Sequence, residues 1–196
     1  LSDRYSFVIA ADECYSEIHF DDAQPPMGAL QAAAKLGRHD FRRLVSFSSL
    51  SKRSSLPGLR SGYVAGDAGI LERFLLYRTY HGSAMSRVVA EASIAAWNDE
   101  HHVRENRRLY REKFDAVLPV LAPVLNVQRP QGGFFLWSPT PFDDTDFVQQ
   151  LYAATGVTTL PGSFLAREAH GMNPGRNRIR IALVASLEDC LEAARR

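Results

Sequence analysis

The sequence predicts an α/β unit followed by a smaller α+β unit. Two runs, residues 7–11 and 44–47, are apolar without alternation, as in buried strands of a parallel sheet. Between and after them, apolar residues recur at helical spacing. Residues 178–183 alternate charged and apolar side chains, which is typical of a half-buried strand. We therefore expect a mostly parallel sheet in the first unit and a mixed helix and strand arrangement in the second.

The elements of the first unit follow in order along the chain. An acidic turn and paired prolines make residues 16–28 an exposed loop, and Gly37 ends a short helix as its C-terminal cap. Ser86 is placed to cap an alanine-rich helix. The expected segments are strands at 7–11, 44–47 and 63–65, and helices at 29–36, 69–78, 87–98 and 102–121.

The helix at 102–121 carries interleaved arginines and glutamates, which favours a solvated face with ion pairs; a nucleic-acid patch is the alternative. Prolines at 119–123 end it, so we place a domain boundary there, with domains at 1–121 and 122–196. The small domain is expected to contain strands at 124–127, 134–137, 157–162 and 178–183, and helices at 146–154 and 187–195, the last capped by Ser186.

Composition narrows the classes of protein. The chain has 196 residues, a formal net charge of +1 and 45% hydrophobic residues, as in an ordinary globular enzyme without a charge bias toward nucleic acid or an anionic membrane. No apolar run reaches the roughly 18 residues of a membrane span. Cys14 and Cys190 lie far apart in sequence, which favours reduced thiols and a cytoplasmic location. The histidines lack metal-ligand spacing, so no metal site is predicted.

One stretch after the second strand carries the predicted chemistry. Ser49 lies three residues before Lys52, and Arg60 lies eight residues after it. A hydroxyl and a forked guanidinium can share one phosphate, while a desolvated lysine acts as a nucleophilic amine toward a carbonyl. Asp12 and Tyr15 follow the first strand and cannot share a face of a regular strand, because the side-chain period there is two. The chain therefore leaves the strand between them.

These motifs resemble the fold-type I pyridoxal-phosphate aminotransferases of class I/II. The resemblance implies a three-layer α/β/α large domain, with Lys52 as the catalytic amine and pyridoxal 5′-phosphate as the cofactor. It implies that Asp12 binds the pyridine nitrogen, that Tyr15 binds the phenolic oxygen, and that Ser49 and Arg60 hold the phosphate. Transamination requires Lys52 to carry a proton between the substrate Cα and the cofactor.

The resemblance extends over nearly all of the chain and is strongest to the N-succinyldiaminopimelate aminotransferases. It implies exchange of an amino group between glutamate and N-succinyl-2-amino-6-oxopimelate, in lysine biosynthesis. Arg180 is expected to clamp the substrate carboxylate, with Arg178 as its rival, while Arg53 or Arg78 suits further carboxylates. A β-lyase or decarboxylase with the same cofactor and a non-catalytic binding module remain open.

The resemblance also implies a homodimer. In the family, a small-residue segment lies at the dimer interface, so Tyr80, His81 and Ser83 are candidates for contact with a partner's site, the alternative being a loop between helices. The family carries about as much chain again before the position of Leu1, with a glycine-rich phosphate turn, a stacking aromatic ring and an asparagine. We expect the 196 residues alone to bind cofactor weakly and to turn over poorly.

Overall fold

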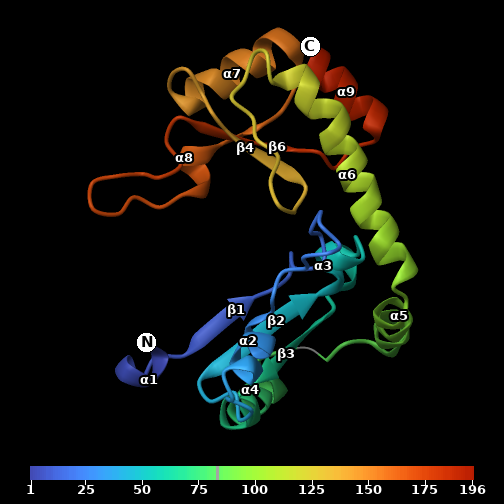
Figure 1. Ribbon diagram of the computed structural model, residues 1–196, viewed down its shortest axis with the longest axis vertical. Coiled ribbons are helices and arrows are strands. Elements are labelled where there is room, and N and C mark those ends of the chain that lie inside the picture. Colours follow the sequence, from blue (N-terminus) through green and yellow to red (C-terminus); the bar gives the residue numbers. More distant parts are fainter. Residues whose placement is uncertain (83) are drawn as a thin grey trace. The chain divides into compact units, whose positions relative to one another are not determined.

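The computed structural model describes residues 1–82 and 84–196, which form two compact units, Leu1–Arg107 and Arg108–Arg196. Figure 1 shows the elements of both units. The first unit contains α1 (Ser2–Tyr5), β1 (Ile9–Asp12), α2 (Ala29–Lys35), β2 (Leu44–Ser49), α3 (Leu50–Arg53), η1 (Pro57–Leu59), β3 (Gly62–Gly66), α4 (Ala68–His81) and α5 (Arg87–Asn98). The second contains β4 (Phe135–Pro139), α7 (Asp144–Thr155), β5 (Leu160–Pro161), α8 (Gly162–Leu165), β6 (Arg178–Ala182) and α9 (Leu187–Arg195), and α6 (His101–Leu121) belongs to both.

The sheet of the first unit is mixed, with strand order β1-β2-β3. β1 and β2 run parallel, as the apolar runs predict, whereas β3 returns antiparallel to β2. The antiparallel pair forms because α3 and η1 turn the chain back at the edge where β2 ends (Figure 1). Leu44, Val45 and Leu50 are buried, and α2 packs against β2. The unit is therefore α/β, with one parallel and one antiparallel pair among the described strands.

β1 is more exposed than its sequence suggests. Its first residue, Ile9, is 40% exposed, and Phe7 and Val8 directly before it are 44% and 51% exposed, so the prediction of a buried strand over residues 7–11 is wrong. The reason is topological, because β1 is an edge strand of the described sheet and pairs only with β2. Strands without alternation are normally covered on both faces.

The sheet of the second unit is antiparallel, with strand order β4-β6-β5. Leu136 and Ile179 are buried in it, and Phe114 and Val117 of α6 are buried in the same unit. The helix caps follow the sequence: Ser186 accepts the N–H of Asp189 at the start of α9. Residues 124–127 form no strand, because Leu121 accepts the N–H groups of residues 124 and 125 in a turn after α6.

The division between units falls at Arg107/Arg108, earlier than the boundary predicted at residues 121/122. α6 continues through Pro119 to Leu121 as predicted, but its second half packs with the second unit. Tyr110 stacks on Phe134 at a centroid distance of 5.8 Å, which shows this packing. The domain boundary at residues 121/122 stays a prediction.

Candidate active site

The predicted cofactor residues lie at one edge of the first sheet. Parallel strands end at the same edge, and Asp12 ends β1 while Ser49 ends β2. Gly62, the first residue of β3, is opposite Ser49 in the antiparallel register, so Arg60 lies at this edge as well. The carboxyl ends of strands are the usual ligand site of an open α/β sheet.

Lys52 lies three residues after the end of β2, on α3. Its Nζ is 5.8 Å from the centroid of the Tyr15 ring, so the segments that follow β1 and β2 meet there. The Ser49 hydroxyl also donates to Cys14 Sγ at 3.5 Å, which joins the same two segments a second time. Lys52 is half-buried and Tyr15 is 43% exposed, which leaves both accessible to a small molecule.

Asp12 is held in its ionised form. The Cys14 thiol and the Cys14 N–H both donate to its carboxylate, the N–H at 3.1 Å, and they hold the pKa of Asp12 below its ordinary value. Burial raises the pKa of the Cys14 thiol itself. An exposed, ionised carboxylate at this position can bind a protonated ring nitrogen.

Two of the predicted phosphate-binding residues already make local contacts. Ser49 is the N-cap of α3, and its oxygen accepts the Ser51 N–H at 3.3 Å. Arg60 adopts a left-handed conformation, with φ of 52°, and donates to the carbonyl oxygen of Pro57 at 2.7 Å. A guanidinium has five N–H groups, so Arg60 keeps donors for an anion. The single O–H of Ser49 donates to Cys14 Sγ, so this hydroxyl has to turn away from the thiol to bind one.

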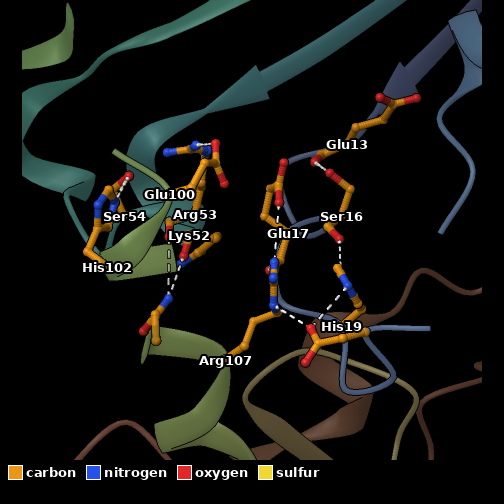
Figure 2. Close-up of polar contacts among 12 residues, drawn as sticks. Glu13, Ser16, Glu17, His19, Lys52, Arg53, Ser54, Glu100, His102 and Arg107 are labelled. Atoms are coloured by element: carbon orange, nitrogen blue, oxygen red, sulfur yellow. Dashed lines mark hydrogen bonds and ion pairs between the residues drawn. The ribbon is translucent and has the colours of Figure 1, made fainter. Parts of the chain in front are cut away.

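The loop that carries Tyr15 is fixed by residues that the sequence did not single out. Arg107 of α6 donates to the carbonyl oxygen of Glu17 at 3.3 Å and pairs with Asp22 at 3.1 Å (Figure 2). Glu13 accepts the N–H of Ala29 at 2.6 Å, which ties the loop to the start of α2. The side chain of Arg107 is only 12% exposed, so the prediction of a solvated face on α6 is wrong at this residue.

Arg53 does not fit the predicted contact with a substrate carboxylate. Its side chain is 3% exposed and pairs with the Glu100 carboxylate, so that prediction is wrong (Figure 2). Tyr80 and His81 lie in the last turn of α4, where Tyr80 is 79% exposed. Ser83 lies outside the described residues.

Arg180 lies on β6 of the second unit, opposite Trp137 in the register with β4. Its guanidinium is 5.7 Å from the centroid of the Phe135 ring. Arg178 is two residues earlier on the same strand and so on the same face, which keeps it a rival for carboxylate binding.

A buried carboxylate fixes the chain that leads into this arginine strand. Asp144 is fully buried and accepts the N–H groups of Ser163 at 2.8 Å and Asn177 at 3.0 Å. Burial opposes its ionisation, but these hydrogen bonds outweigh burial and lower the pKa of Asp144. Asn177 directly precedes β6, so Asp144 anchors the start of the strand that carries both arginines.

Two kinds of site are not found in the part of the chain that the structure describes. Within residues 1–82 and 84–196, no helix has the length and apolar character to cross a membrane. The same residues contain no group of three His, Cys, Asp or Glu side chains placed to hold a metal ion.

Known proteins resemble this chain over its whole length. The crystal structure of an aminotransferase from Neisseria meningitidis matches 99% of the chain with 55% identity and a TM-score of 0.92, and the chain covers 49% of it. A probable N-succinyldiaminopimelate aminotransferase from Thermus thermophilus matches 98% with 27% identity and a TM-score of 0.83, with 50% of it covered. An LL-diaminopimelate aminotransferase from Maridesulfovibrio salexigens is 28% identical over 98% of the chain and 48% of its own length.

The chain thus spans about half the length of the proteins it matches. The family model for aminotransferase class I and II matches residues 1–196. Together with the α/β fold and the lysine at the sheet edge, this match shows that the chain belongs to the class I and II aminotransferases.

Proposed function

We propose that this chain carries the lysine-bearing part of the active site of a pyridoxal-phosphate-dependent aminotransferase. The main support is the distance of 5.8 Å between the Lys52 Nζ and the centroid of the Tyr15 ring. This contact lies at the sheet edge where Asp12 ends β1 and Ser49 ends β2. An amine, a phenol and a carboxylate meet there from two strands that are far apart in sequence.

The donor set suits pyridoxal 5′-phosphate. Asp12, with its lowered pKa, provides the charge that keeps a pyridine nitrogen protonated, and the Tyr15 hydroxyl is a donor for the phenolic oxygen. Ser49 and Arg60 provide a hydroxyl and a guanidinium for the phosphate. When bound, this cofactor supplies an electron sink for the bond that breaks at the substrate Cα.

The residues of this chain then have distinct tasks. Lys52 would hold the cofactor through its amine and, as a base, would move the proton at the substrate Cα. Arg180 binds the substrate α-carboxylate bidentately and orients the Cα–H bond, with Arg178 as the alternative.

For the substrates, we propose glutamate as amino donor and N-succinyl-2-amino-6-oxopimelate as acceptor. The similarity to the probable N-succinyldiaminopimelate aminotransferase supports this choice. The similarity to LL-diaminopimelate aminotransferases supports a second candidate, the same carbon skeleton without the succinyl group. We further propose a cytoplasmic homodimer, in keeping with the family resemblance.

An absorbance experiment on the complete gene product tests the cofactor and the lysine. Pyridoxal phosphate is added to the wild-type protein, to Lys52→Ala and to Lys35→Ala, the last a control at an exposed lysine of α2. We expect a visible band of the lysine-bound cofactor in the wild type and in Lys35→Ala but not in Lys52→Ala. Glutamate should then replace that band with the pyridoxamine spectrum.

Other outcomes would contradict the proposal at defined points. A wild-type protein without the band would support a cofactor-free binding module. A band that persists in Lys52→Ala would assign the reaction to a different amine. Product analysis with both candidate acceptors then identifies the substrate, and release of ammonia or carbon dioxide would indicate a β-lyase or a decarboxylase instead.

A further inference from the structure

The helix that carries Lys52 is too short to be stable alone. α3 comprises four residues, Leu50–Arg53, which is about one turn. A single turn fixes several backbone dihedrals for one hydrogen bond, so isolated helices of this length do not persist in water. The orientation of Lys52 must therefore depend on what holds α3 in place. Two groups from the end of α5 and the start of α6 do so.

The first group is the buried guanidinium of Arg53. It donates to the carbonyl oxygen of Ala96 at 2.9 Å and pairs with the carboxylate of Glu100 (Figure 2). It also lies over the Trp97 ring, 5.0 Å from the centroid. Ala96 is in the last turn of α5, where carbonyl groups have no intrahelical partner and a cation is favoured. Arg53 therefore fastens the end of α3 to the end of α5.

The second group acts on the backbone of Lys52 itself. The side-chain amide of Asn106 donates to the carbonyl oxygen of Lys52 at 3.2 Å, and it also lies 3.5 Å from the carbonyl oxygen of Arg53. These carbonyls are at the C-terminal end of α3, where they lack helical partners. His102 adds a contact, because its Nε2 is 2.8 Å from the Ser54 hydroxyl while Asp99 holds its Nδ1 at 2.7 Å.

We propose that Asn106 and Arg53 are positioning residues for Lys52, a proposal that rests on the proposed function of that lysine. Asn106 binds the carbonyl group of Lys52, and Arg53, the next residue, is anchored to Ala96 of α5 and to Glu100. The two contacts therefore set the direction in which the Lys52 side chain leaves α3 toward Tyr15. Their effect is on the geometry with which the amine reaches an aldehyde, and a misplacement of about 1 Å can cost on the order of 100-fold in rate.

The test measures capture of an aldehyde by Lys52 in the complete gene product. The probe is pyridoxal, which lacks the phosphate, so that binding at Ser49 and Arg60 does not mask an effect on the amine. The main variant is Asn106→Asp, which keeps the shape of the side chain but replaces the amide donor with an acceptor. Arg104→Ala, at an exposed position on the same helix, is the matched control.

Three readouts separate positioning from stability. They are the rate at which the visible band grows, the pH midpoint of that band, and the melting temperature of the cofactor-free protein. We expect Asn106→Asp to slow capture about 10-fold or more and to shift the pH midpoint, while Arg104→Ala changes neither. Arg53→Leu should have the same effect, and Arg53→Lys, which keeps the charge but not the fork, should restore part of the rate.

The outcomes distinguish this proposal from the proposed function. Capture by Asn106→Asp within about twofold of wild type, with the same pH midpoint, would overturn the positioning role even though Lys52→Ala abolishes the band. A band that survives in Lys52→Ala would instead overturn the proposed function. If Asn106→Asp does not fold, Arg53→Leu decides: capture within about twofold of wild type, with the same pH midpoint, would overturn the positioning role.

Discussion

Replacement of Asp144 by asparagine should destabilise the second unit strongly. The carboxylate is fully buried and accepts two backbone N–H groups, from Ser163 at 2.8 Å and from Asn177 at 3.0 Å. An asparagine of the same shape has only one carbonyl oxygen, so it keeps one acceptor and turns its NH₂ group toward the other donor. One hydrogen bond is lost, and the other loses its charge.

The expected size follows from these two changes. A hydrogen bond to a charged group contributes about 1.5–3 kcal/mol and a neutral one about 0.5–1.5 kcal/mol. Loss of one charged bond and conversion of the other to a neutral bond together give about 2.5–4.5 kcal/mol. Asp146→Asn is the matched control, because it makes the same change in the same first turn of α7 at an exposed position. Its cost should be below about 1 kcal/mol, the size of a helix-dipole effect.

Urea unfolding followed by tryptophan fluorescence measures this cost. The chain has two tryptophans, Trp97 in the first unit and Trp137 in the second, so a Trp97→Phe background reports on the second unit alone. The folded-state pKa of Asp144 is lowered, so the stability it adds is complete above its unfolded pKa of about 3.9 and is lost as pH falls through the folded value. The deficit of Asp144→Asn should therefore be constant from about pH 5 to 8 and narrow only below about pH 4. A cost equal to that of Asp146→Asn, or a deficit that disappears at neutral pH, would refute this reasoning.

Three further predictions concern the first unit. Asp67→Ala removes the acceptor for the N–H groups of Gly69 and Ile70 at the start of α4 and of Arg43 before β2, so it should lower the urea midpoint; an unchanged midpoint would contradict the capping role. Gly66→Ala places a Cβ against the carbonyl of Leu44 at a φ of 142°, so it should cost more than about 2 kcal/mol, and an unchanged unfolding midpoint would show that the strand end relaxes. In a Cys190→Ser background, alkylation of Cys14 by iodoacetamide should rise at a pH above that of a free cysteine, because burial raises its pKa; an ordinary pH profile would show that the thiol is solvated.

The sequence was most informative where a short motif follows a strand. The order of Asp12 after one apolar run and of Ser49 and Lys52 after another was enough to predict that they meet, since parallel strands end at one edge of a sheet. The exposure of Ile9 was not predictable, because burial of a strand depends on which neighbours cover it. Apolar composition alone does not determine that.

Arg53 and Arg107 show the second limit. Both occur in charged stretches that are ordinarily solvated, and nothing in their local sequence marks them as buried. Arg53 is buried and Arg107 is mostly covered because their partners come from distant segments: Glu100 is 47 residues from Arg53, and the carbonyl of Glu17 is 90 residues from Arg107. The sequence offered one weak indication that Arg53 is buried: it directly follows Lys52, and only the lysine was needed for the predicted chemistry.

These contacts give the start of α6 a structural role in the site that its sequence does not suggest. Asn106 fixes the turn that carries Lys52, and the neighbouring Arg107 fixes the loop that carries Tyr15. The two segments to which we assign cofactor groups under the proposed function are thus fastened to adjacent residues of one helix. A shift of that helix would move both segments together and preserve their mutual geometry, whereas a change at either side chain would move one segment relative to the other. The second kind of change should harm the reaction more than the first, because catalysis depends on the relative placement of the amine and the phenol.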